Sequence, residues 1–320
     1  MKILYLGGLF PAEFSLVKEA QNNPNLELLF VDCQGSFQEY IPVAKPIYVA
    51  NRTDVDKIKK DFQPDITIFR NWTPPENLIQ SGEVLWHQEI YVTLDDGTRP
   101  YSYTPPKQAI VAYQSRPMSV VNKQHWLPYC ASAHWGLIPN IVRTIPVMVA
   151  TNLTDSSTGG SIKRRSMDIL VKPIVEFDFN LVYAYNGIYG GLQNVSYLAP
   201  CIKPSYKLLD MPSTLSRVKI YISPTSIWYD EGCVSYKIYE AMACGCLVLT
   251  NNYIGMEAVF GKDGENLIYS NTPEDSLDKV RYYLDHEKER EEIAERGRQF
   301  ITSEYSWEKH ITRLAQEIKK

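Results

Sequence analysis

The chain lacks three patterns that would place it in other protein classes. No apolar run approaches the roughly 18 residues of a membrane-spanning helix. The six cysteines are scattered and none forms a Cys-x-x-Cys pair, which disfavours structural zinc and predicts reduced thiols in a cytoplasmic protein. Neither sign of charge dominates the chain, whose formal net charge is -4. We therefore expect no general attraction to nucleic acid or to an anionic membrane.

What is present is a globular composition, with 44% hydrophobic and 22% charged residues. A chain of 320 residues is long for one hydrophobic core, so we expect two domains of ordinary size. The opening segment MKILYLGGLF is short and turns polar without a cleavage pattern, which indicates a first strand rather than a signal peptide.

Apolar strands alternate with helical patterns along both halves of the chain, which predicts an α/β fold with two doubly wound parallel sheets. We expect domains over residues 1–140 and 141–320, facing a cleft, with residues 125–140 crossing between them. Residues 156–161, SSTGGS, are typical of a flexible turn. The predicted strands cover residues 2–10, 26–33, 46–50, 64–71, 90–97, 109–114, 144–151, 180–187, 218–224 and 246–252, and predicted helices cover 14–23, 55–62 and the start of 162–177, with a break at Pro173.

Residues 235–250, SYKIYEAMACGCLVLT, form the most informative segment. The pattern is an amphipathic helix that stops at Gly245 and leads directly into a continuous apolar run, which is typical of a buried parallel strand. Glu240 is the one carboxylate of this segment. On the first turns of such a helix an acid can accept two hydrogen bonds from a ribose diol, although Glu240 could equally be an ordinary surface residue.

The same segment resembles the nucleotide-binding part of GT-B retaining glycosyltransferases of the group-1 family, and most closely the spore-maturation-type branch. The following loop YIGMEAVFG, the GENLIYS strand and the helical C-terminus also resemble that family, over roughly residues 215–315. The resemblance implies a GT-B fold of two Rossmann-like domains whose final helix returns to the N-terminal domain. It implies a hexosyltransferase that uses a nucleotide-diphosphate sugar, with UDP as the favoured nucleotide, without a metal or other cofactor and with retention.

The resemblance also implies donor-binding residues. Lys237 stands where the branch typically has Arg, and the backbone of residues 234–236 would complete a diphosphate cradle. The basic helix start with Arg164 and Arg165 is electrostatically unfavourable unless it meets an anion, although it could simply be solvated. An acid that many family members place near the sugar falls on Gly232, so the sugar's identity stays open. The implied donor set is Ser235, Tyr236, Lys237, Glu240, Arg164, Arg165, Gly255, Met256 and Glu257.

Candidate acceptor-side residues lie in the first half. Asp95 and Asp96 follow a strand and could position or deprotonate an acceptor hydroxyl, although Asp-Asp-Gly is also a common turn. Gly7 and Gly8 would let the backbone approach a ligand closely. The histidines and tryptophans are better explained by packing.

Two alternatives from other classes remain. A NAD-dependent oxidoreductase is disfavoured because GGLFPAEF lacks the GxGxxG fingerprint, although Asp32 ends the second strand as a ribose-binding acid would. A non-catalytic nucleotide-sugar-binding protein would have the same fold and no turnover. The acceptor stays open among polysaccharide, protein, small molecule and modified DNA.

Overall fold

The computed structural model divides into two compact units. Unit 1 contains the described residues of Met1–Ile90, Ser102–Trp135 and Glu304–Lys320, and unit 2 contains those of Gly136–Ser303. The sequence placed the boundary after residue 140, with residues 141–320 in one domain. The structure describes residues 1–33, 40–49, 51–70, 79–87, 107–114, 124–131, 136–150, 159–176, 181–184, 197, 208–224, 234–253 and 255–320.

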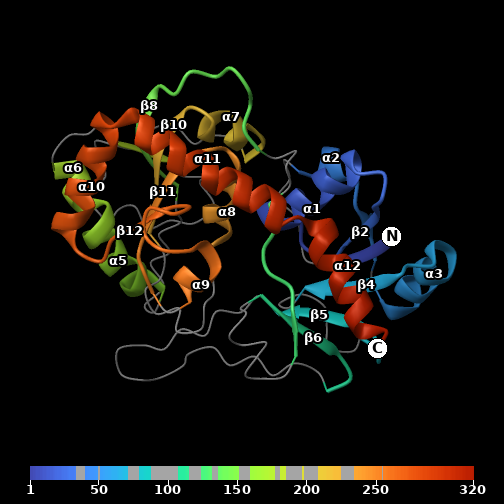
Figure 1. Ribbon diagram of the computed structural model, residues 1–320. Coiled ribbons are helices and arrows are strands. Elements are labelled where there is room, and N and C mark those ends of the chain that lie inside the picture. Colours follow the sequence, from blue (N-terminus) through green and yellow to red (C-terminus); the bar gives the residue numbers. More distant parts are fainter. Residues whose placement is uncertain are drawn as a thin grey trace. The chain divides into compact units, whose positions relative to one another are not determined.

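Unit 1 is built on a sheet whose described strands are all parallel, in the order β3-β2-β1-β4-β5-β6-β7. Figure 1 labels β2, β4, β5 and β6 of this sheet. The order reverses between β1 and β4, so this sheet has its topological switch point at the carboxyl ends of those two strands. The strands are β1 Lys2–Gly7, β2 Glu27–Asp32, β3 Ile47–Tyr48, β4 Ile66–Arg70, β5 Val84–His87, β6 Ile110–Tyr113 and β7 His125–Trp126.

Four described helices belong to unit 1, and the last of them comes from the far end of the chain. They are α1 Pro11–Asn22, α2 Ile41–Ala44, α3 Arg52–Phe62 and α12 Trp307–Ile318. Glu19 of α1 accepts hydrogen bonds from the backbone N–H groups of Trp307 (3.0 Å) and Glu308 (2.8 Å), so one carboxylate caps the start of α12. Further along α12, Arg313 donates to the carbonyl of Trp126 at 2.6 Å, which covers the edge strand β7.

Unit 2 repeats the architecture with a smaller sheet, whose described strands are parallel in the order β12-β11-β10-β8-β9. Its switch point lies between β8 and β10. The elements are β8 Ile145–Ala150, α5 Gly159–Leu170, α6 Lys172–Glu176, β9 Leu181–Ala184, a 3-10 turn at Leu208–Asp210, α7 Met211–Leu215, β10 Val218–Ser223, α8 Tyr236–Ala243, β11 Leu247–Thr250, α9 Met256–Phe260, β12 Ile268–Tyr269, α10 Pro273–Asp285 and α11 Glu287–Glu304.

The helix-to-strand turn at Gly245 follows from its local chemistry. Gly245 has a left-handed φ of 72°, its N–H donates to Met242, and the N–H of Cys246 reaches back to Ala241. This pair of bonds is the Schellman motif, in which glycine avoids the strain that a Cβ would bring at positive φ. The following strand LVLT is fully buried, as the apolar run predicted. Gly245 thus ends α8 and lets the chain turn directly into β11.

Three local expectations need revision. Residues 125–140 were expected to be only a crossing segment, yet His125–Trp126 pair with β6 as strand β7, because a two-residue edge strand leaves no readable periodicity. Gly159 and Gly160 start α5 instead of forming a turn. The break expected at Pro173 falls at Val171, and Pro173 is the second residue of α6, where a missing N–H costs little.

Candidate functional site

The switch point of unit 2 carries a cation. Lys237, in the first turn of α8, extends its ammonium to the carbonyl of Ala150, the last residue of β8, at 2.7 Å. The phenol of Tyr221 on β10 donates to the same carbonyl at 3.0 Å. Ala150 thus anchors side chains from α8 and β10. The resulting arrangement places a positive charge at the carboxyl edge of the sheet, where ligands of this fold class bind.

Helix α8 brings the predicted donor residues together. Ser235 is its N-cap, with extended backbone and no side-chain capping bond, and Tyr236 begins the helix with a largely buried side chain. Glu240 follows Lys237 by three positions, so the two side chains lie on neighbouring parts of one helix face. The Glu240 side chain belongs to a residue that is only 6% exposed. The alternative that Glu240 is an ordinary surface residue is therefore wrong. A carboxylate is rarely buried without a specific role, which favours a function for Glu240.

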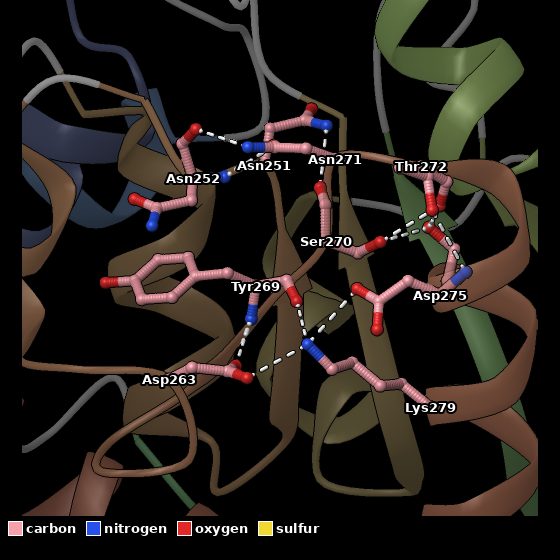
Figure 2. A network of polar contacts seen from close by, with 10 residues as sticks. Asn251, Asn252, Asp263, Tyr269, Ser270, Asn271, Thr272, Asp275 and Lys279 are labelled. Carbon is pink, nitrogen blue, oxygen red and sulfur yellow. Dashed lines mark hydrogen bonds and ion pairs between the residues drawn. The ribbon is translucent and has the colours of Figure 1, made fainter.

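The carboxyl ends of β11 and β12 are joined by three asparagines that the sequence analysis did not single out (Figure 2). Asn252 and Asn271 exchange hydrogen bonds: the N–H of Asn252 donates to the Asn271 side chain at 3.0 Å, and the Asn271 amide donates to the Asn252 carbonyl at 2.9 Å. Asn251 is buried, donates to the Ser270 carbonyl and accepts from the hydroxyl of Ser166 on α5. The TNN sequence after β11 could have been recognised as amide-rich, but the partners come from distant segments.

A second part of this network fixes β12 to α10. The ammonium of Lys279 contacts Asp263 at 2.9 Å, Asp275 at 3.2 Å and the carbonyl of Tyr269 at 2.5 Å, and Figure 2 shows it between these groups. Asp263 also accepts from the N–H of Tyr269 at 2.7 Å. These bonds satisfy backbone and charged groups around a two-residue strand, so we assign them a structural role.

The predicted loop residues beyond β11 differ in what they can offer. Gly255 has a φ of 92° and is the N-cap of α9, whereas Met256 is fully buried. The backbone N–H of Met256 donates to the carbonyl of Tyr253 at 3.1 Å, so this N–H is already bonded within the loop. Glu257 is exposed, and its carboxylate accepts from the Asn252 side chain at 2.8 Å. Of the three, Glu257 is placed to act through its side chain.

The predicted basic helix start is less favourable than the sequence indicated. Arg165 is exposed and lies six residues after Gly159, about 9 Å along the axis of α5 at 1.5 Å per residue. It is therefore distant from the helix N-terminus, where an anion would bind. The side chain of Arg164 lies outside the described residues, as do Asp95 and Asp96.

In unit 1, Gly7 and Gly8 are buried at the end of β1. A Cβ at Gly7 would come within 3.0 Å of the Arg70 Cβ on the neighbouring strand β4, so the glycine accommodates Arg70. A polar cavity of about 360 Å³ lies at the opposite edge of this sheet, lined by Lys59, Glu83 and Lys319 among others. That cavity contains none of the predicted site residues.

Among the described residues, no group of three or more His, Cys, Asp or Glu side chains could hold a metal ion. In the same part of the chain, no helix is long and apolar enough to cross a membrane.

Comparisons with known proteins agree with this geometry. Residues 190–316 match the family described as Glycosyl transferase-like. The chain is similar over its full length to Anabaena Alr3699/HepE, solved with UDP and with UDP-glucose, at 12% identity, with the UDP complex fully covered and a TM-score of 0.67. A T4 phage BGT variant in complex with UDP-glucose gives 12% identity, 99% coverage of both chains and a TM-score of 0.62.

A third similar structure is described as a UDP-N-acetylglucosamine 2-epimerase from Listeria monocytogenes. It has 13% identity and a TM-score of 0.56, with 95% of this chain and 94% of that chain covered. A search of curated proteins finds no match. The chain therefore has the GT-B fold of two Rossmann-like units, and its residues 190–316 are similar to the Glycosyl transferase-like family.

Proposed function

We propose that this protein is a hexosyltransferase that takes a sugar from a UDP-linked donor and transfers it to a hydroxyl acceptor. The observation that carries the proposal is the ammonium of Lys237, held at the switch point of unit 2 one helical turn before the buried carboxylate of Glu240. A cation at this position can neutralise the diphosphate that develops charge as it leaves, and a carboxylate one turn away can accept from the ribose diol.

The test is donor binding followed by turnover. UDP and uridine should both bind, with UDP much tighter, and a UDP-sugar should release UDP when a suitable acceptor, or water, is present. UDP-glucose is the first probe because two of the similar structures hold it. Binding of neither UDP nor any UDP-sugar would contradict the proposal, whereas binding without turnover over an acceptor panel would favour the non-catalytic alternative.

One rival has a specific observation in its favour, since a similar fold occurs in a protein described as a UDP-N-acetylglucosamine 2-epimerase. Fold alone does not separate transfer from epimerisation. The family match over residues 190–316 favours transfer. The two activities differ in products: a transferase frees UDP, whereas an epimerase changes the sugar's configuration while UDP stays attached. Analysis of the reaction mixture by NMR with UDP-N-acetylglucosamine distinguishes them.

Metal independence and retention are further parts of the proposal. Lys237 and the N-terminus of α8 supply positive charge to a diphosphate without a divalent ion. We expect UDP-sugar turnover to continue in excess EDTA; strict dependence on Mg²⁺ or Mn²⁺ would contradict this part. Retention rests on the family resemblance, and the anomeric configuration of the product, read by NMR, tests it.

Asp95 and Asp96 remain our candidates for positioning or deprotonating the acceptor hydroxyl. The argument is the sequence alone, because both residues follow a predicted strand. Asp95→Asn and Asp96→Asn should be compared separately. The variant that lacks the functional carboxylate should keep its UDP affinity and lose about 10²–10⁴ in turnover. Wild-type turnover in both variants would assign the pair to a turn.

A further inference from the structure

The switch point of unit 1 also carries a cation, which no sequence pattern indicated. Arg70 is the last residue of β4, beside Gly7 at the end of β1, and the two strands are the pair between which the strand order reverses. In doubly wound sheets a ligand binds in the crevice outside the carboxyl ends of this strand pair. Arg70 therefore lies where the fold itself makes a site.

The guanidinium of Arg70 is held on two sides. Its Nη1 lies 3.1 Å from Oε1 of Glu13, in the first turn of α1, and the Tyr5 hydroxyl donates to the same oxygen at 3.0 Å. The ring of Phe10 lies against the guanidinium, with 4.2 Å between the ring centroid and Cζ of Arg70. Burial is the largest single influence and would lower the pKa of Arg70, but the nearby charges of Glu13, Tyr5 and Tyr129 together raise it, so the arginine stays charged. Few rotamers of Arg70 satisfy all these contacts, so the guanidinium is preorganised.

The two partners of the ion pair differ in exposure. The Glu13 side chain is fully buried, whereas the Arg70 side chain is 18% exposed although its Nη1 is buried, so solvent reaches part of the arginine side chain and none of the carboxylate. The amino end of α1, a helix of 12 residues, begins four positions after Gly7 and adds its own positive end. A buried ion pair is usually no more stable than a well-packed apolar pair, so its position at the ligand edge calls for a functional reason.

We infer that this switch point is an oxyanion site in which Arg70, positioned by Glu13, binds a phosphate group. Within the proposed function, on which this assignment rests, the phosphate belongs to the acceptor. Arg suits this role because its planar fork donates two parallel hydrogen bonds to phosphate oxygens. Gly7 contributes by leaving room for the Arg70 side chain to pass.

The experiment titrates the full-length protein with inorganic phosphate, followed by calorimetry and by thermal shift. A Lys237→Met background removes phosphate binding at α8 from the signal. In that background we compare two variants. Glu13→Gln keeps the arginine, whereas Glu13→Gln/Arg70→Gln replaces both partners by neutral side chains and so leaves no buried charge unpaired. Lys288→Gln, at a lysine side chain that is 93% exposed, is the matched control for loss of one positive charge.

We expect phosphate to bind the background protein and Lys288→Gln equally, and to bind Glu13→Gln at least as tightly. The neutral double variant should bind at least tenfold more weakly. Equal phosphate affinity in the background and the double variant, or no binding to the background at all, would overturn the inference and leave the ion pair with a structural role only.

A second arm tests the assignment to the acceptor, using proteins with Lys237 intact. UDP affinity should be the same in the wild type and in Glu13→Gln/Arg70→Gln although phosphate binding in the first arm is lost, because the acceptor and not the donor carries this phosphate. A tenfold or larger loss of UDP affinity would contradict the acceptor assignment. Failure of the wild type to bind UDP would contradict the proposed function without touching the phosphate result.

Discussion

The two switch points hold their cations in different ways. In unit 1, Arg70 contacts a buried carboxylate, so its charge is compensated before any ligand arrives. In unit 2, Lys237 donates to the carbonyl of Ala150, which carries no net charge. Through these contacts both side chains are held at the ends of strands. In our proposals, Lys237 binds the donor's diphosphate and Arg70 binds a phosphate of the acceptor.

We expect the largest effect from removing the Lys237 ammonium at the switch point of unit 2. Lys237→Met should lower UDP-sugar turnover by about 10²–10³, the range for one lost charge-stabilising donor. It should weaken UDP binding and leave uridine binding nearly unchanged, because the nucleoside has no phosphate. Calorimetry with both ligands measures this, with Lys172→Met as the control at a half-exposed lysine. Equal losses for UDP and uridine would mean that Lys237 merely holds Ala150 and α8 together.

Lowering the pH should reduce the stability of unit 1 through His310, a buried histidine with no equivalent among the described residues of unit 2. Burial, followed by the nearby charge of Arg313, lowers the pKa of His310 to about 4 from an ordinary 6.5, and its ring lies against Trp126 while Nε2 contacts the carbonyl of Glu304 at 2.9 Å. The imidazole is neutral in the folded state, whereas the unfolded chain takes up a proton below 6.5. The His310 contribution to stability is therefore complete above pH 6.5 and falls as the pH drops toward 4.

The expected loss over this window is about 3 kcal/mol, from about 2.5 units at 1.36 kcal/mol each. Denaturant unfolding at several pH values measures it, and His310→Gln should flatten the dependence between pH 6.5 and 4. Burial raises the pKa of Glu19, which acts in the opposite direction, but that contribution cancels in the difference between wild type and variant. Parallel pH profiles for the two proteins would contradict the role of His310.

The buried carboxylates of the two units differ in their partners. Glu13 contacts a cation, whereas Glu240 is proposed to bind a neutral diol. Glu240→Ala should weaken UDP binding by about 1–3 kcal/mol. It should weaken the binding of 2′-deoxy-UDP less, because that ligand keeps only the 3′-hydroxyl as a donor to Glu240. Calorimetry with both nucleotides in a variant shown to be folded by circular dichroism decides this. The same loss for both ligands would assign Glu240 a packing role.

The smallest effect is expected at Arg165, whose exposed position lies beyond the start of α5. Arg165→Ala should change UDP affinity by less than about 1 kcal/mol, as is usual for an exposed charge, and less than Lys237→Met does. Raising the salt concentration should remove most of what remains. A loss as large as that of the lysine variant would show that the arginine reaches the diphosphate.

The pattern of apolar strands and helical spacing was sufficient to predict both parallel sheets, because a strand buried on two faces has a recognisable local sequence. It was also sufficient for the stop at Gly245 and for α8, where a helix, a glycine and a buried strand are adjacent in the chain. Strands β5 and β7 were not predicted, because neither VLWH nor HW shows a period of two on its own. Their pairing with neighbours, and not their own periodicity, makes them strands.

The sequence by itself determined the fold class and the segment that contains Lys237 and Glu240, since their spacing along one helix is a local property. Only the tertiary structure decided what those side chains contact, because Ala150 lies 87 positions before Lys237. The same holds for Arg70 and Glu13, which are 57 positions apart and meet only when β4 pairs with β1. Local propensity selects the elements, and burial of their apolar faces determines which polar side chains meet at the strand ends.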